Sequence, residues 1–147
     1  MLRDVVEADL PVFYEHQLDP ESTGMAAFPP RKEWSDFLAH WTKILGNPTG
    51  CIQTITWNER VVGYIASWPQ EEKRLIAYWI GREYWGRGIA TAALMEFLGR
   101  DRARPLHAFV AAHNVGSIRV LEKCGFVRGG EVETRPGAVE EYLYRFG

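Results

Sequence analysis

The pattern of the first thirty residues predicts a short strand, a helix and a loop. Leu2–Val6 is predicted to form that strand. A helix that ends near Leu18 is predicted next, with Asp9 as its N-cap and Pro11 in its first turn. The segment Asp19–Pro30 carries three prolines and a glycine, so it is predicted to be a loop. Loops of this length in compact domains are often functional.

A second helix is predicted over Arg31–Leu45, where apolar positions recur three and four residues apart. The sequence Gly46-Asn47-Pro48 ends it. Trp34 and Trp41 are seven residues apart and therefore share one face of this helix. Two interpretations stay open for them: core or groove-lining residues, or residues that shape a substrate pocket.

The pattern changes to strands from Cys51 onward. Cys51–Trp57 is rich in β-branched residues, and Arg60–Trp68 is predicted to return beside it after a tight turn at Asn58-Glu59. A polar turn at Pro69–Lys73 leads into a third strand, Arg74–Ile80. This last segment is apolar on both faces, which is typical of a central strand.

The rest of the chain predicts alternating helices and strands after a glycine-rich turn at Gly81–Gly88. The predicted elements are a helix over Ile89–Arg100, a strand over Leu106–Ala112, a helix from Asn114 to Cys124, and a closing pair of strands, Phe126–Arg135 and Val139–Phe146, around Pro136-Gly137. The order β-α-α-β-β-β-α-β-α-β-β predicts an α/β fold of mixed, α+β-like type. We expect one domain over residues 1–147, with a mostly antiparallel sheet of about six to seven strands and helices on both faces.

Composition narrows the class of protein. The chain has 147 residues, 46% of them apolar and 24% charged, which is typical of a soluble globular protein. The sequence shows neither an apolar run that could span a membrane nor a secretion signal, so a cytoplasmic location is expected. The net charge of −2 gives no overall attraction to nucleic acid. Cys51 and Cys124 are expected to be free thiols, and no Cys/His spacing indicates a metal site.

The strongest chemical signal is the segment from Ile80 to Thr91, where a buried strand leads through a glycine-rich turn into an amphipathic helix. Backbone N–H groups at a helix N-terminus lack partners, and the helix dipole is positive there. Gly86 and Gly88 carry no side chain, and Ala90 is small, so the turn suits a bulky anion such as a pyrophosphate. A tight strand–helix turn that needs glycine for its geometry alone is the alternative.

This turn matches neither of the common nucleotide-binding motifs. The P-loop pattern is absent, and Thr91 stands where a dinucleotide-binding turn has its third glycine. A second signal lies at residues 113–126. There Asn114 is predicted to be an N-cap, and Ser117 the third residue of the helix that follows.

Together the two segments resemble motifs A and B of the GCN5-related N-acetyltransferase (GNAT) superfamily, most closely its RimJ/RimL-like branch. The family's phosphate-binding motif, [QR]-x-x-G-x-[GA], is similar to the run from Trp85 to Ala90, with Trp85 in place of the Gln or Arg. The second motif is matched by Asn114 and Ser117, followed by the run Glu122–Phe126.

The resemblance implies an acetyl-CoA site. In the family, the central strand separates from its neighbour at a bulge, and the pantetheine of coenzyme A inserts there. The backbone of Ile80 is then expected to bond the pantetheine, and a backbone N–H there to polarise the thioester carbonyl. The residues expected to hold the pyrophosphate through their backbone are Trp85, Gly86, Arg87, Gly88, Ile89, Ala90 and Thr91. Asn114 is expected to bond the pantetheine, and Ser117 to lie near the sulfur.

The resemblance also implies catalytic roles. Many relatives protonate the departing thiolate with a Tyr seven residues after the Asn, but this position is Leu121 here. Ser117 is the replacement candidate. Glu141, in the predicted last strand, is the candidate for the base that takes the amine proton. Glu140, His16 and Glu71 are further candidates for that base.

Two further groups of side chains are candidates for contacts to the cofactor phosphates and to the acceptor, and neither group identifies the acceptor. Candidates for phosphate contacts are Arg82, Arg87, Arg119 and Lys123, each of which could equally be a solvated surface charge. The acceptor region carries aromatic and acidic residues that suit a cationic amine or a hydrophobic core: Phe13, Tyr14, His16, Glu21, Phe28, Trp34, Trp41 and Tyr142.

The implied activity is acetyl transfer from acetyl-CoA to an amine acceptor, a small molecule or a protein N-terminus, by direct attack on the thioester in a ternary complex. No metal is expected, and the protein is expected to be a monomer or a homodimer. The alternative is a GNAT-fold module that binds acyl-CoA without turnover, as a sensor or interaction module. A binder of another nucleotide or phosphate is the third hypothesis.

Overall fold

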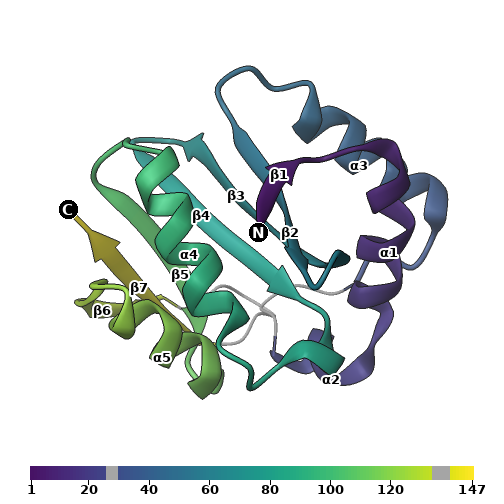
Figure 1. The fold of residues 1–147 in the computed structure, drawn as a ribbon. Coiled ribbons are helices and arrows are strands. Elements are labelled where there is room, and N and C mark those ends of the chain that lie inside the picture. The colour runs from purple at the N-terminus through teal and green to yellow at the C-terminus, as the bar shows by residue number, and fades with distance from the viewer. Residues whose placement is uncertain (26–29, 134–139) are drawn as a thin grey trace.

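A computed structural model describes residues 1–25, 30–133 and 140–147. In these ranges seven strands form one sheet in the order β1-β2-β3-β4-β5-β7-β6 (Figure 1). The strands are β1 (Leu2–Asp4), β2 (Cys51–Trp57), β3 (Arg60–Gln70), β4 (Lys73–Ile80), β5 (Leu106–Ala111), β6 (Val127–Glu133) and β7 (Glu141–Phe146). All neighbouring strands are antiparallel except β4 and β5, which are parallel. The predicted mixed, mostly antiparallel sheet is therefore confirmed.

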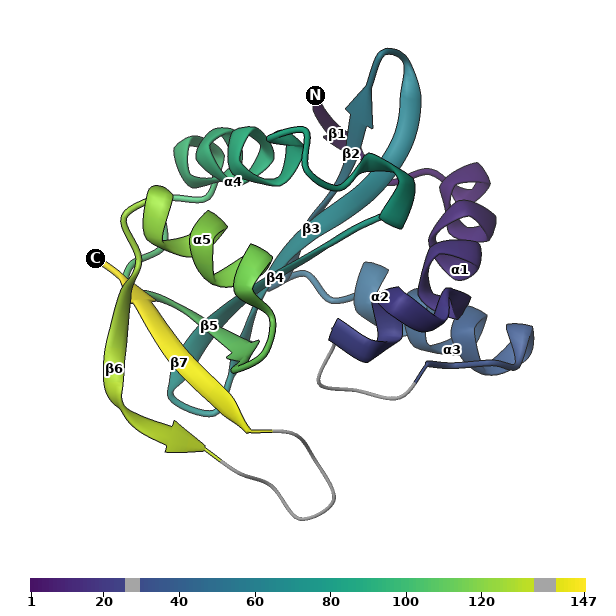
Figure 2. The same ribbon diagram turned by 90° about the horizontal axis from the view of Figure 1, so that it is seen from below.

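Helices cover both faces of the sheet, as predicted (Figure 2). They are α1 (Leu10–Leu18), α2 (Pro20–Met25), α3 (Trp34–Leu45), α4 (Ile89–Arg100) and α5 (Val115–Lys123), with 3₁₀ turns at Glu7–Asp9 and Arg82–Tyr84. On one face α4 and α5 pack on the main core, which includes Ile76, Leu94 and Phe97. On the other face α1 and α3 enclose a second cluster around Phe13 and Trp41. No helix in the described ranges is long and apolar enough to cross a membrane.

The second core cluster shows where the two α3 tryptophans lie. Trp41 is buried, and its ring lies 5.0 Å from that of Phe13 and 4.8 Å from that of Tyr64, centroid to centroid. Trp34 is 40% exposed and makes an edge contact with Tyr14. Trp41 is thus a core residue, whereas Trp34 lies at the rim of the same cluster.

Three amino-terminal predictions are corrected. The segment Asp19–Pro30 is not a loop throughout, because Pro20–Met25 forms α2. Asp19 explains this local helix: its carboxylate accepts hydrogen bonds from the backbone N–H and the hydroxyl of Ser22. The first strand ends at Asp4 rather than Val6, because the chain enters a 3₁₀ turn.

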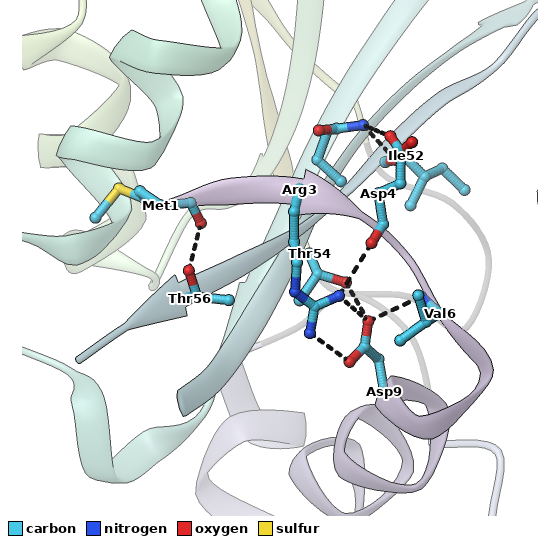
Figure 3. A network of polar contacts seen from close by, with 9 residues as sticks. Met1, Arg3, Asp4, Val6, Asp9, Ile52, Thr54 and Thr56 are labelled. Carbon is cyan, nitrogen blue, oxygen red and sulfur yellow. Dashed lines mark hydrogen bonds and ion pairs between the residues drawn. The ribbon is translucent and has the colours of Figure 1, made fainter. Parts of the chain in front are cut away.

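Asp9 is not the side-chain cap of α1. Its buried carboxylate instead accepts two hydrogen bonds from the Arg3 guanidinium at 2.8 Å, one from the Thr54 hydroxyl at 2.7 Å and one from the Val6 N–H at 3.0 Å (Figure 3). Burial raises the pKa of this carboxyl, but the Arg3, Val6 and Thr54 donors outweigh it, so the pKa lies below its ordinary value. The network joins β1, β2 and the start of α1.

Other boundaries differ by one to three residues. Helix α3 begins at Trp34, β3 continues to Gln70 and α5 ends at Lys123. Gly125 follows α5 with a φ of +95°, the left-handed conformation expected after a helix end. In the described residues β6 begins at Val127 and β7 at Glu141, while the predicted end of β6, the predicted start of β7 and the expected turn at Pro136-Gly137 lie outside them. Cys51 and Cys124 are free thiols, as expected.

Candidate active site

The candidate site lies where β4 and β5 separate. These parallel neighbours pair only at Arg74–Leu106 and Leu75–His107, near their amino-terminal ends. Beyond these pairs the two strands diverge toward their carboxyl ends (Figure 2). Helix α4 follows β4, and α5 follows β5. Both helix N-termini therefore lie at the same end of the gap, with their positive dipole ends toward it.

The backbone of Ile80 faces this gap. The N–H of Gly81 donates to the carbonyl of Val62 on β3 at 2.8 Å. Hydrogen-bonding groups alternate between the two edges of a strand, so the N–H and C=O of the preceding residue, Ile80, point away from β3. The β3–β4 register is continuous from Gln70 to Gly63, so the bulge expected in this strand is not present in the β3–β4 pairing.

Gly86 and Gly88 shape the turn between β4 and α4. Their φ angles are +76° and +77°, a left-handed region that glycine adopts without strain. Within the described structure, a Cβ added at either position would have no heavy atom within 4 Å, so the space above the turn is open. The first helical bond of α4 runs from the Ala92 N–H to the Gly88 carbonyl. The N–H groups of residues 89–91 thus precede the helical ladder and follow directly on this open part of the turn.

Trp85 ties this turn to the sheet. Its indole Nε1 donates to the carbonyl of Ile80 at 2.8 Å, while 40% of the residue stays exposed. The carbonyl of Ile80 therefore has a partner within the chain, and the Ile80 N–H is the group directed at the gap. This contact was not predicted from the sequence.

The start of α5 matches the sequence prediction. Asn114 is the N-cap, and its Oδ1 accepts the N–H of Ser117 at 3.1 Å. The Ser117 hydroxyl lies 2.6 Å from the hydroxyl of Tyr78 on β4. Burial raises the pKa of Tyr78 to about 12, although the Ser117 hydrogen bond acts in the opposite direction. Sequence reasoning missed Tyr78, whose only signal is a polar tip within the apolar strand β4.

Leu121, where many relatives carry a Tyr, is buried in the main core. A side chain at this position is therefore enclosed by the protein core. The other predicted cofactor residues, Arg87, Ile89, Ala90 and Thr91, lie in the turn and the first turn of α4. Ile89 is buried there, while Arg87 is exposed.

The four candidate phosphate-binding cations differ in their surroundings. Arg82 pairs with the carboxylates of Asp19 at 3.0 Å and Glu21 at 3.3 Å, so its charge is shared with the α2 region. Arg119 and Lys123 lie exposed on α5. Among the residues that the structure describes, no group of three or more His, Cys, Asp or Glu side chains is arranged to hold a metal ion.

The candidate bases are separated by the fold. Glu141 is 3% exposed and opposes Ala111 at the carboxyl end of β5. Its neighbour Tyr142 packs against the α4/α5 core, so the side chain of Glu141 lies on the opposite face of the sheet. Glu71 lies in the turn before β4, at the far end of the strand from Ile80, and is excluded by position. Glu140 is exposed.

His16 lies against the end of β4. A Cβ added to Gly81 would lie 2.6 Å from the His16 Nε2, so the absence of a side chain at Gly81 makes room for the imidazole. Burial lowers the pKa of His16 and outweighs the opposing charges of Glu83 and Glu15. Its Nδ1 is buried without a hydrogen-bond partner in the described parts of the chain. His16 is therefore neutral at physiological pH, near the end of the gap.

The comparison with protein families identifies the class. The acetyltransferase (GNAT) domain model matches residues 1–127, so the chain belongs to the GNAT acetyltransferase family. The resemblance drawn from the two sequence motifs is thereby confirmed. No curated protein matches the sequence.

Solved structures share the fold at low sequence identity. Spermidine N-acetyltransferase from Vibrio cholerae, solved with CoA and spermine, is 15% identical with a TM-score of 0.82, covering 98% of this chain and 93% of that one. RimJ from Mycobacterium smegmatis, in complex with CoA-disulfide, is 20% identical with a TM-score of 0.78, covering 99% and 80%. The aminoglycoside acetyltransferase AAC(6')-Ib, in complex with coenzyme A, is 23% identical with a TM-score of 0.75, covering 97% and 92%.

Proposed function

We propose that the protein transfers an acetyl group from acetyl-CoA to an amine acceptor by direct attack on the thioester in a ternary complex. The observation that carries this proposal is the gap between β4 and β5, bordered by the N-termini of α4 and α5. A strand-like pantetheine could add to the free edge of β4, and a pyrophosphate could bind at the open turn of Gly86 and Gly88. Membership of the GNAT family supports this assignment.

The proposed cofactor contacts follow the open backbone groups. The Ile80 N–H is assigned to the thioester carbonyl, where a preorganised donor stabilises the oxyanion of the tetrahedral intermediate. Turn residues 85–91 are assigned to the pyrophosphate through their N–H groups. Asn114 and Ser117 are assigned to the pantetheine and the sulfur, because both lie at the start of α5 beside the gap.

The proposed reaction needs a base and a donor to the leaving group. The neutral amine nitrogen attacks the thioester carbon, and its proton passes to Glu141, which is buried on the face opposite α4 and α5. As the intermediate collapses, the carbon–sulfur bond breaks and the sulfur leaves with the electron pair. The Ser117 hydroxyl donates a hydrogen bond to that sulfur, and solvent completes its protonation.

The acceptor is proposed as an amine class. Spermidine N-acetyltransferase and an aminoglycoside acetyltransferase share this fold, and both names describe amine-bearing acceptors. In this chain Glu141 and the neutral His16 lie on the face of the sheet that carries α1, where an amine could approach without crossing the cofactor. A small molecule and a protein N-terminus both fit this description.

The non-catalytic alternative has one observation in its favour: the buried Leu121 replaces the tyrosine that many relatives use. A protein that only senses acyl-CoA would bind it but would not transfer the acyl group to any amine, so no CoA would be released.

For the whole chain we propose one domain over residues 1–147, located in the cytoplasm as a monomer or homodimer. It would act without a metal and without a nucleic-acid partner. A sedimentation experiment that shows a large closed ring would contradict the proposed monomer or homodimer.

Calorimetry with acetyl-CoA, ATP and NAD in parallel tests the cofactor first. We expect micromolar binding of acetyl-CoA alone. Release of CoA with a panel of polyamines, aminoglycosides, amino acids and peptide N-termini then tests turnover. Binding of acetyl-CoA without release of CoA in the presence of any amine would favour the sensor alternative. If the protein binds no acetyl-CoA, both the enzyme and the sensor hypotheses are overturned.

A further inference from the structure

Tyr78 connects the two elements that border the gap. It lies on β4, two residues before Ile80 and therefore on the same face, and its ring packs against the α4/α5 core. Its hydroxyl lies 2.6 Å from that of Ser117 in the first turn of α5. Because β4 and β5 do not pair at this level, this contact joins β4 to α5 directly.

Either hydroxyl could be the donor in this hydrogen bond. In the described structure the Tyr78 hydroxyl has the Ser117 hydroxyl as its hydrogen-bond partner. Because a buried phenol proton needs an acceptor, we assign Tyr78 as the donor and the Ser117 oxygen as the acceptor. Burial raises the pKa of Tyr78 to about 12, so the phenol keeps this proton throughout the physiological range.

Ser117 is held from two sides. Its N–H donates to the Asn114 Oδ1 at 3.1 Å, and in this assignment its hydroxyl oxygen accepts from Tyr78. With Tyr78 assigned as the donor, the hydroxyl proton of Ser117 has no other acceptor among the contacts of the described residues. That proton is therefore available to a ligand atom in the gap.

We propose that Tyr78 is a positioning residue that aims the Ser117 hydroxyl proton at the sulfur of coenzyme A. The inference rests on the proposed acetyl transfer and adds a residue to it. When the carbon–sulfur bond breaks and the sulfur takes the electron pair, the Ser117 O–H donates to the thiolate while Tyr78 keeps its own proton. Tyr78 on β4 thus supports the leaving-group step in a chain that has the buried Leu121 at the position where many relatives carry a tyrosine.

The titration of bound CoA tests this without turnover. A donor aimed at sulfur stabilises the thiolate, so the pKa of the CoA thiol is expected to be lower when bound than in solution. Thiolate absorbance gives this pKa, as the difference between CoA-bound and CoA-free protein. Subtraction removes Cys51 and Cys124, whose pKa values burial raises. Tyr78→Phe is expected to raise the bound thiol pKa by about half a pH unit or more.

Tyr144→Phe is the matched control. Tyr144 is buried in the same core, and its hydroxyl donates to Glu122 at 3.0 Å, also on α5. Both substitutions remove one phenol oxygen that contacts α5, but only Tyr78 contacts Ser117. If Tyr78 merely holds α5 in place, the two variants will shift the thiol pKa equally, which would overturn the proposal.

A double-mutant cycle with Ser117→Ala separates action through Ser117 from a general effect. Tyr78→Phe alone is expected to lower kcat about fivefold with unchanged acetyl-CoA affinity. In the Ser117→Ala background the same change is expected to have no further effect. Additive losses would refute the relay through Ser117. An unchanged thiol pKa in a variant that binds CoA normally would refute this inference alone, whereas wild-type protein that binds no CoA would remove the proposed function as well.

Discussion

The indole of Trp85 donates a hydrogen bond of 2.8 Å to the backbone carbonyl of Ile80, the last residue of β4. Trp85 begins the turn that is proposed to hold the pyrophosphate, and Ile80 is proposed to bond the thioester. One side chain thus sets the distance between two parts of the cofactor site.

Trp85→Phe removes the N–H of the indole and keeps an aromatic ring. We expect the free energy of unfolding to fall by about 1 kcal/mol and acetyl-CoA binding to weaken about fivefold, because the turn loses its tether. Trp68→Phe is the control, since its Nε1 makes only a long 3.4 Å bond to Gln70. Equal binding by both variants, measured by calorimetry, would show that the tether is irrelevant to the cofactor.

Gly88→Asp and Gly88→Asn test the phosphate site as a pair. Both residues tolerate a left-handed conformation and match in size, so they differ mainly by one negative charge. The Asp variant is expected to bind acetyl-CoA about tenfold more weakly than the Asn variant. This difference in affinity is expected to become smaller at high salt. Because an acid stabilises a helix N-terminus, the Asp variant should unfold at the same or a higher temperature. Equal acetyl-CoA affinities of the two variants would show that the cofactor phosphates bind away from Gly88.

Glu141→Gln tests the proposed base. We expect kcat to fall about a hundredfold with little change in acetyl-CoA affinity, because the amide keeps the shape of the side chain but takes no proton. Glu140→Gln is the matched control on the exposed neighbour. Should the two variants retain similar kcat, His16 becomes the candidate, and His16→Gln is then measured in the same assay.

Gly63→Ala tests how closely β3 approaches β4. An added Cβ would lie 1.9 Å from the Trp79 carbonyl oxygen, a backbone atom that cannot move without breaking the sheet. We expect a loss of about 3 kcal/mol in the free energy of unfolding by urea. Gly99→Ala, in the last turn of α4 with open space around the added Cβ, is expected to cause no loss and to gain up to about 0.5 kcal/mol from helix propensity. A stable Gly63→Ala protein would contradict this β3–β4 pairing.

The acid stability of the fold depends on Asp9. Its pKa is lower in the folded protein than in the unfolded chain, so its contribution is present above the unfolded pKa of about 3.9 and is lost as the pH falls through the folded value. Asp9→Asn is expected to cost about 2 kcal/mol at neutral pH, because a buried, charge-assisted network is broken (Figure 3). The difference between the wild type and this variant should shrink as the pH falls below about 4. A pH-independent difference, measured by denaturant unfolding, would contradict this.

Local pattern predicted most elements because the apolar period is strong in each of them. Helix α4 was predicted with its observed bounds, Ile89–Arg100, since its apolar stripe is uninterrupted and glycine precedes it. The α2 helix was missed because its stability comes from Asp19 bonding Ser22, a local contact that proline content obscures. Asp9 has the sequence signature of a helix cap. Its carboxylate instead bonds Arg3 on β1 and Thr54 on β2, and these tertiary contacts determine its role.

The sequence by itself determined the order of the strands and of every helix except α2, the family and the segments that border the gap, because helix and strand periods, glycine turns and cap residues are local properties. The tertiary structure alone decided where β4 and β5 stop pairing, that Ile80 directs its N–H at the gap, and that Trp85 takes its carbonyl. It also placed Tyr78 against Ser117, thirty-nine residues later, and turned Leu121 into the core. These relations join distant segments across the sheet, and only the packing of the whole chain can fix them.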